Sequence, residues 1–230
     1  MGLHTLATGI DAAGVRLDAD LVMPAEALGV VLFAHGSGSS RHSPRNTVVA
    51  EHLHRHRLGT ILPDLLTRDE TIEDEHTRRL RFDIGMLADR LIGVIDWIGA
   101  QDWRHGQPYQ GNHEPNVPPV IGLFGASTGA AAALVAAAAR RDAVRAVVSR
   151  GGRPDLAGPA LVQVAAPTLL IVGEHDPDVM ALNRDARAQL TTLSDLLMIP
   201  GAGHLFEEEG ALEQVSAAAA AWFADHLRRA

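Results

Sequence analysis

Short, mostly apolar runs alternate along this chain with segments of helical spacing, and the alternation limits the folds that the chain can adopt. The run 28–34 (LGVVLFA) ends in a loop rich in glycine and serine, and similar runs lie at 60–62, 120–124, 144–149, 168–172 and 196–199. A strand buried on both faces has this appearance, which is typical of a parallel sheet covered by helices. The sequence therefore predicts an α/β fold, a three-layer α/β/α sandwich with a mostly parallel sheet.

The segments between these runs favour helices. Ser43 is placed to cap a helix whose first position is Pro44, a common start signal. Apolar residues recur at helical spacing over 80–99, 130–139 and 211–228. Two weaker strands at 5–10 and 15–22 predict an edge hairpin, which brings the sheet to about eight strands. The polar stretch 101–119, rich in proline and glycine, is expected to be a loop or insertion.

Composition restricts the class of protein. With 47% apolar and 21% charged residues and no internal boundary, residues 1–230 are expected to form one globular domain. The formal charge of −8 argues against a nucleic-acid partner, which requires clustered lysine and arginine. The chain has no cysteine, so any nucleophile must be a hydroxyl, an amine or a carboxylate. Neither a leader peptide nor a long apolar span is visible, and we expect a cytoplasmic protein without membrane contact.

One serine stands where a nucleophile is expected. The segment 125–129 (GASTG) lies between an apolar strand and an alanine-rich helix. A sharp turn from strand to helix needs small neighbours and presents its middle residue, Ser127, at the carboxyl end of the strand. The alternative is a tight turn in which Ser127 is an ordinary helix cap.

A serine hydroxyl needs a base, and the base needs an orienting acid. In a doubly wound sheet both should follow later strands at the same sheet edge. Asp176 follows the strand 168–172 and His204 follows the strand 196–199, which predicts Asp176 as the acid and His204 as the base. Glu174 and Asp178 are competing acids, and Asp178 is better placed to cap the next helix.

The loop after the strand 28–34 is the predicted oxyanion hole. A tetrahedral intermediate needs two N–H donors, and we expect them to come from Ser37 in this loop and from Thr128 after the nucleophile. Gly36 and Gly38 allow the backbone to approach a substrate. A phosphate cradle is the alternative, but the spacing of the known phosphate-binding loops is missing. His35 is expected to brace the loop.

Four motifs in this order, HG-x-G at 35–38, G-x-S-x-G at 125–129, G-E-x-D at 173–176 and G-x-G-H-x-F at 201–206, resemble the α/β-hydrolase superfamily. Within it the chain looks like the dienelactone-hydrolase-like serine esterases. The resemblance implies an α/β-hydrolase fold with Ser127, Asp176 and His204 as catalytic residues. One departure matters: dienelactone hydrolases themselves use a cysteine nucleophile, so the resemblance implies ester hydrolysis rather than dienelactone as the substrate.

Several residues are candidates for shaping the substrate site. The short piece after the strand 144–149 leaves no room for a large lid domain, so the site is expected to be open. Arg150 and Arg153 are candidates to hold a substrate carboxylate, with a salt bridge to a neighbour such as Asp155 as the alternative. Arg41 is open to the same two interpretations. Apolar candidates for the pocket wall are Leu65, Leu66 and Met180.

The predicted function is hydrolysis of carboxylic esters with small or exposed acyl groups, through an acyl-enzyme and without a cofactor or metal. His52 and His56 are one helical turn apart, but no further ligand at metal spacing accompanies them, and a solvated helix face is expected. The predicted partner is a small-molecule ester, and the protein is expected to be a monomer or homodimer. Alternatives are a thioesterase, amidase or acyltransferase with the same residues, and a binding protein that retains the fold.

Overall fold

The computed structural model describes residues 3–24, 26–104, 107–109 and 118–228. These residues form an eight-stranded sheet in the order β1-β2-β4-β3-β7-β8-β9-β10. The strands are β1 (Leu3–Ala12), β2 (Val15–Pro24), β3 (Gly29–Ala34), β4 (Leu58–Pro63), β7 (Ile121–Ala126), β8 (Val144–Arg150), β9 (Thr168–Gly173) and β10 (Ser194–Ile199). β2 runs antiparallel to β1 and to β4, and the pairs from β4 to β10 are parallel. The predicted edge hairpin and the mostly parallel sheet are therefore confirmed.

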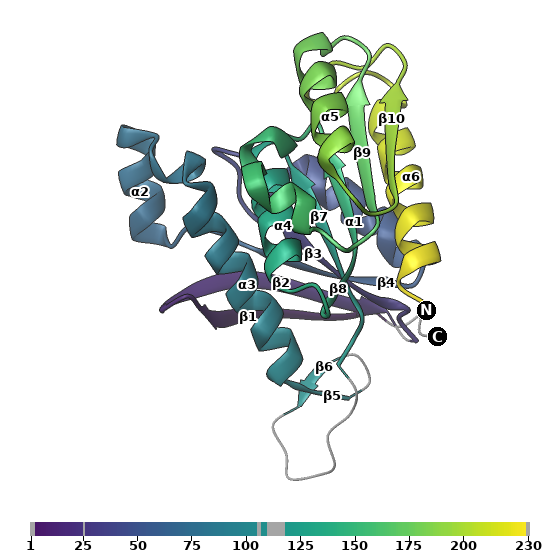
Figure 1. Ribbon diagram of the computed structural model, residues 1–230. Helices are drawn as coiled ribbons and strands as arrows, with labels where there is room; N and C mark the ends of the chain where they lie inside the picture. Colours follow the sequence, from purple (N-terminus) through teal and green to yellow (C-terminus); the bar gives the residue numbers. More distant parts are fainter. Residues whose placement is uncertain (1–2, 25, 105–106, 110–117, 229–230) are drawn as a thin grey trace.

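Helices cover both faces of this sheet (Figure 1). The first face carries α1 (Pro44–Arg55) and α6 (Ala211–His226), whose apolar residues share a core with β3, β7 and β8. The second face carries α3 (Ile84–Ala100) and α4 (Thr128–Ala139), together with α5 (Pro177–Gln189) and the 3₁₀ segment η2 (Pro154–Gln163). The three-layer sandwich predicted from the sequence is confirmed, and β8 and β9 are joined through η2 without a large lid.

Local sequence explains the two helices that flank the site. The hydroxyl of Ser43 accepts from the N–H of Asn46 and Pro44 opens α1, as predicted. In α4, alanines are buried on nearly every side. Because their side chains are small, the backbone of α4 can lie close both to the sheet and to α3. This close packing sets the direction of α4 where it follows β7.

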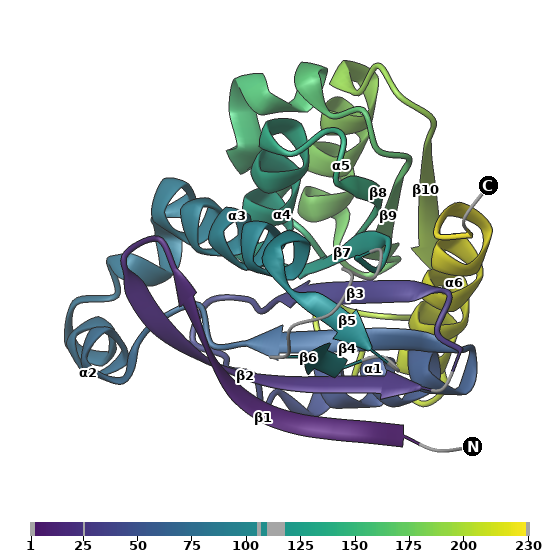
Figure 2. The same ribbon diagram turned by 90° about the horizontal axis from the view of Figure 1, so that it is seen from below.

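Two segments differ from the sequence-based prediction. The helix predicted at 80–99 begins at Ile84, where the side chain of Asp83 caps it, and a single 3₁₀ turn, η1 (Leu80–Phe82), precedes it. An additional helix, α2 (Arg68–Thr77), was not predicted because it has no apolar stripe. Figure 2 shows α2 set apart from the sheet, beyond the start of α3.

The predicted loop at 101–119 lies largely outside the described residues. Its described part holds two three-residue strands, β5 (Asp102–Arg104) and β6 (Gln107–Tyr109), which pair antiparallel. Trp103 is buried and its indole N–H donates to the carbonyl of Ile98 at 2.8 Å, so this hairpin is fastened to the end of α3.

None of the helices in the described ranges combines the length and apolarity needed to cross a bilayer.

Candidate active site

The turn from β7 into α4 holds Ser127 in an unusual backbone conformation, with φ of 50° and ψ of −121°. A non-glycine residue rarely has a positive φ, and such strain persists only where the surroundings enforce it. The neighbours supply the reason: a Cβ on Gly125 would lie 2.4 Å from Ala130 Cα, and one on Gly129 would lie 2.2 Å from the carbonyl oxygen of Ala34. Ser127 makes no side-chain cap on α4, so its hydroxyl is not an ordinary helix cap.

The segment 150–153, which leaves β8, connects the surroundings of Ser127 with those of His204. The N–H of Ser127 donates to the carbonyl of Arg150 at 3.2 Å, and the N–H of Arg153 donates to the carbonyl of Ser127 at 3.1 Å. Between them lies Gly151, where a Cβ would be 3.7 Å from the His204 ring carbon Cε1. Ser127 and the imidazole of His204 are thus built against the same four-residue segment.

Asp176 and His204 meet directly. The Nδ1 atom of His204 lies 2.6 Å from Oδ2 of Asp176. Asp176 occupies the N-cap position of α5, but its carboxylate makes no cap hydrogen bond and contacts the histidine instead. The prediction that Asp178 caps this helix was wrong, because Pro177 takes the first helical position and leaves Asp178 in the first turn.

The loop that carries His204 is held from two sides. The side chain of Glu174 accepts from the N–H of Gly201 at 2.7 Å, and that of Glu208 accepts from the N–H of Gly203 at 2.9 Å. Glu174, a competing acid in the sequence, therefore positions the histidine loop rather than the imidazole.

The predicted oxyanion residues Ser37 and Thr128 line one cavity of about 880 Å³. β3 and β7 are adjacent, with Ala34 opposite Gly125, so the loop after β3 lies beside the Ser127 turn. A Cβ on Gly36 would lie 3.2 Å from Ser127 Cβ, which measures how closely the two loops approach. Thr128 is the first residue of α4, and the N–H of a first helical residue has no acceptor within its own helix.

His35 braces this loop, as predicted. Its Nε2 accepts from the N–H of Leu65 at 3.0 Å, so the proton resides on Nδ1, which donates to the carbonyl of Gly36 at 3.1 Å. Burial lowers the pKa of His35 below its ordinary value, against a weaker opposite effect of the hydrogen bond to Gly36. The neutral ring links β3 to the chain that follows β4.

Two of the candidate arginines are already paired. Arg153 makes two hydrogen bonds to Asp155, at 2.8 and 2.7 Å, which is the salt bridge that the sequence left open as the alternative. Arg41 lines the cavity, but its guanidinium binds Asp64 and its N–H donates to the same carboxylate at 2.7 Å. Arg150 is the exception: it is 8% exposed, it is not among the residues that line the cavity, and it has no salt bridge among the described residues.

Of the three apolar candidates for the pocket wall, one lines the cavity and two do not. Leu66 lines the cavity. Leu65 is fully buried in the core beneath α3, and Met180 packs against Val172 and Val179. Neither Leu65 nor Met180 is among the residues that line this cavity. Both follow a strand end in sequence, but their side chains point into the protein.

Sequence reasoning missed two contributors to the site. Asn183, in α5, is fully buried, and its amide donates to the carbonyl of Gly152 at 3.0 Å and to that of Val179 at 2.8 Å. It therefore ties α5 to the segment between Ser127 and His204. The second is α2, which contributes Thr71, Ile72 and Glu75 to the cavity. A lone asparagine and a polar helix carry no signal that sequence alone could separate from a solvated surface.

The described residues include no group of three or more side chains arranged to hold a metal ion. His52 and His56 stack on each other, with ring centroids 4.8 Å apart.

The fold and the strained turn place the chain in the class of α/β hydrolases, and the comparisons specify the family. The model of the dienelactone hydrolase family matches residues 17–227. The crystal structure of a dienelactone hydrolase from Anabaena variabilis is 52% identical, with a TM-score of 0.90 over 99% of this chain and 100% of that one. The chain therefore belongs to the dienelactone hydrolase family, a family of hydrolases.

Two further relatives show how far the likeness extends. Est1E from Butyrivibrio proteoclasticus has the same fold, with a TM-score of 0.75 and 18% identity over 95% of this chain and 98% of that one. A Mycobacterium tuberculosis protein, provisionally named a phosphoribosyl transferase, is 51% identical over 216 residues. That match covers 94% of this chain and 45% of the relative, so the chain spans about half the length of the curated relatives that it matches.

Proposed function

We propose that this chain hydrolyses carboxylic esters through Ser127, His204 and Asp176. The observation that carries the proposal is the 2.6 Å contact between Asp176 and Nδ1 of His204. A carboxylate that accepts from Nδ1 holds the imidazole in the tautomer whose Nε2 is free to take a proton from a serine hydroxyl. The strained turn and the uncapped hydroxyl of Ser127 support the role of nucleophile.

The proposed reaction has two halves. Ser127 Oγ attacks the acyl carbon while His204 removes its proton, and the N–H groups of Ser37 and Thr128 bind the negative oxygen that forms. His204 then protonates the leaving alcohol. Water, deprotonated by the same imidazole, attacks the acyl-enzyme and releases the acid.

The transferase name of the M. tuberculosis relatives does not extend to this proposal, because more than half of each relative lies outside the match. Thioesters, amides and acyl acceptors other than water use the same chemistry and are the nearest alternatives. A panel of activated esters, thioesters and anilides ranks these substrates by kcat/KM.

The proposal is tested by Ser127→Ala (S127A). We expect ester turnover to fall by about 10⁴- to 10⁶-fold, because loss of the nucleophile leaves only the contribution of binding and the oxyanion hole. Ser194→Ala, at the start of the edge strand β10, is the matched control and should retain wild-type turnover. A fluorophosphonate probe should label the wild type and not S127A. Equal turnover in S127A and wild type would refute the assignment.

A further inference from the structure

Arg150 lies directly beside the proposed nucleophile. It is the last residue of β8, it stands opposite Ala126 in the neighbouring strand, and its carbonyl accepts from the N–H of Ser127 at 3.2 Å. The position of its backbone relative to Ser127 is therefore fixed by the sheet itself and does not depend on a loop.

The guanidinium of Arg150 is buried without an anion. The residue is 8% exposed, its Nη1 atom is buried without a hydrogen-bond acceptor, and no carboxylate pairs with it within the described part of the chain. Two other arginines have a carboxylate partner: the buried Arg90 binds Glu70 at 2.7 Å, and the half-buried Arg81 binds Asp74 at 2.5 Å. Arg150 differs from both.

The charged neighbour of Arg150 is a second cation. Burial, and then the charge of Arg45, lower the pKa of Arg150 to about 10, so it still carries its charge at neutral pH. Arg45 lies in the first turn of α1 and lines the cavity that Ser37 and Thr128 also line. One of its terminal nitrogens reaches Glu207 at 3.1 Å, while its Nε is buried without a partner.

A buried cation that lacks a counter-ion destabilises the folded state, because desolvation is not offset by an ion pair. Two guanidinium groups that repel each other increase this cost. Proteins tolerate such an arrangement where a ligand supplies the missing charge, and functional sites are where local rules are broken. A guanidinium binds the oxygens of a carboxylate or a phosphate in a bidentate geometry.

We infer that Arg150 and Arg45 form a subsite for an oxyanion group of the substrate, a carboxylate or a phosphate, next to the ester bond that Ser127 attacks. The inference rests on the proposed function and specifies its substrate class as anionic esters. The cavity provides the route to Arg45, and Arg150 provides the charge that no residue of the described chain neutralises.

Paired esters test the subsite. The carboxylate arm compares 4-nitrophenyl hydrogen succinate with 4-nitrophenyl methyl succinate, and the phosphate arm compares an acetyl ester of glycerol phosphate with the same ester of glycerol. We expect the wild type to prefer the anionic member of at least one pair by about 10- to 100-fold in kcat/KM, the effect of a charge-assisted hydrogen bond. Preference in one arm identifies the anion. A wild type that does not prefer the anionic member in either arm overturns the inference, whether or not any variant folds.

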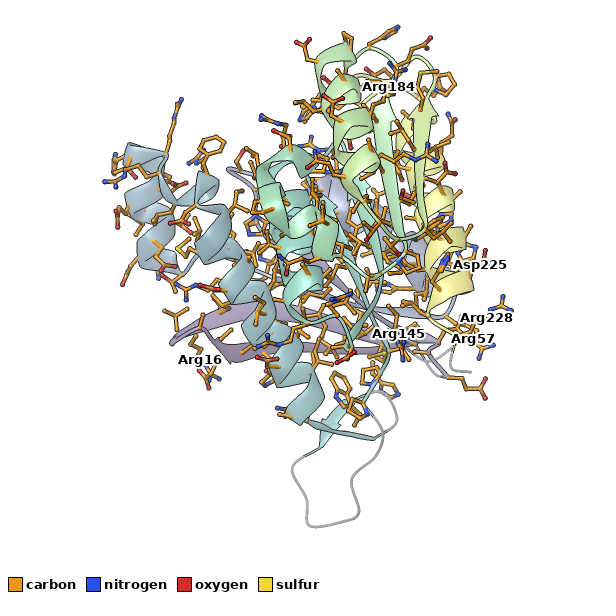
Figure 3. The ribbon with its side chains drawn as sticks, viewed as in Figure 1. Arg16, Arg57, Arg145, Arg184, Asp225 and Arg228 are labelled. Atoms are coloured by element: carbon orange, nitrogen blue, oxygen red, sulfur yellow. The ribbon has the colours of Figure 1, made fainter. Side chains whose placement is uncertain are left out.

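Substitutions of Arg150 test whether this residue causes the preference for the anionic ester. In Arg150→Gln the ratio of anionic to neutral kcat/KM should fall to near one, and Arg150→Lys should restore part of it. Arg145→Gln is the matched control, since Arg145 is an exposed arginine at the opposite end of the same strand (Figure 3). An unchanged ratio in Arg150→Gln would overturn the assignment to this residue.

Stability provides a second readout. Because Arg150 is an uncompensated buried cation, Arg150→Met should raise Tm by about 2–4 °C, whereas Arg145→Gln should leave it unchanged. In the S127A protein, glutarate or inorganic phosphate should raise Tm, and the addition of Arg150→Gln should abolish that rise. Failure of the proposed function is recognised separately: S127A would then retain ester turnover, whereas a failed subsite leaves Ser127-dependent turnover without an anion preference.

Discussion

At the scale of single residues, the candidate site is distinguished by two side chains at helix N-termini that do not cap their helices. Ser127 and Asp176 both occupy N-cap positions, of α4 and α5, and neither side chain caps its helix. Serine and aspartate are preferred caps because they satisfy a free N–H of the first turn. Both groups are instead available for the contacts of the site, and the helices begin without that stabilisation.

The acid can be tested at this scale. Asp176→Asn keeps the shape, but its amide carries no charge and can donate to Nδ1, which favours the wrong tautomer of His204, so we expect kcat to fall by about 10⁴-fold. Thermal stability should change little, because the carboxylate makes no cap hydrogen bond. Asp178→Asn, two positions along in an exposed place, is the control and should be near wild type. Comparable losses in the two variants would contradict the assignment of Asp176.

The residue scale also shows what the sequence could predict. The sequence could predict that Ser127, Asp176 and His204 lie at the same edge of the sheet, because each follows a strand and parallel strands have their carboxyl ends at one edge. Leu65 also follows a strand, and Met180 lies in the first turn of the helix after β9, yet both point into the protein. Sequence position locates a residue at the edge of the sheet, but the direction of its side chain depends on packing that only the structure reveals.

At the scale of elements, α2 is a helix without an apolar face. Its N-terminus is fixed by a capping box in which the Thr67 hydroxyl accepts from Glu70 N–H and the Glu70 carboxylate accepts from Thr67 N–H. The other oxygen of Glu70 binds Arg90 of α3 at 2.7 Å. These are capping and tertiary contacts, which explains why hydrophobic periodicity gave no sign of the helix whereas it located the strands.

The attachment of α2 is tested with Glu70→Gln. Glutamine can still accept from Thr67 N–H, but it leaves the buried Arg90 without a charge partner, which costs about 1–3 kcal/mol. Amide hydrogen exchange in α2 should therefore accelerate by about 5- to 100-fold. Glu73→Gln, an exposed change on the same helix, is the control. If exchange in α2 is unaltered by Glu70→Gln, this ion pair does not hold the helix in place.

At the scale of the whole molecule, stability is expected to depend on pH through buried histidines. Burial lowers the pKa of His35 and of His54, whose Nε2 lies 2.8 Å from the Thr60 hydroxyl. Unfolded histidine takes up a proton near pH 6.5. Between that pH and the lower folded pKa, the unfolded chain binds more protons, so stability rises with pH. The contribution is complete above about pH 6.5 and is lost as the pH falls below it.

The check is Tm measured between pH 7.5 and 5.0. Tm should fall toward pH 5, because the free energy of unfolding decreases by at most about 1.4 kcal/mol per pH unit for each histidine. His35→Gln, whose amide oxygen can still accept from Leu65 N–H, should give a flatter profile. An equally steep profile in that variant would show that His35 does not titrate on unfolding.

The sheet is open at both of its edges, β1 and β10, and the proposed reacting groups follow β7, β9 and β10, so only the β1 edge is remote from them. Additional polypeptide can extend the sheet beyond β1 without disturbing the proposed catalytic geometry, because β2, β4 and β3 lie between that edge and β7, which carries the Ser127 turn. In the M. tuberculosis relatives the matched region makes up 45% of the length, so it is part of a longer polypeptide there. The β1 edge is therefore the side of the sheet where a further segment can attach without contact with the proposed reacting groups.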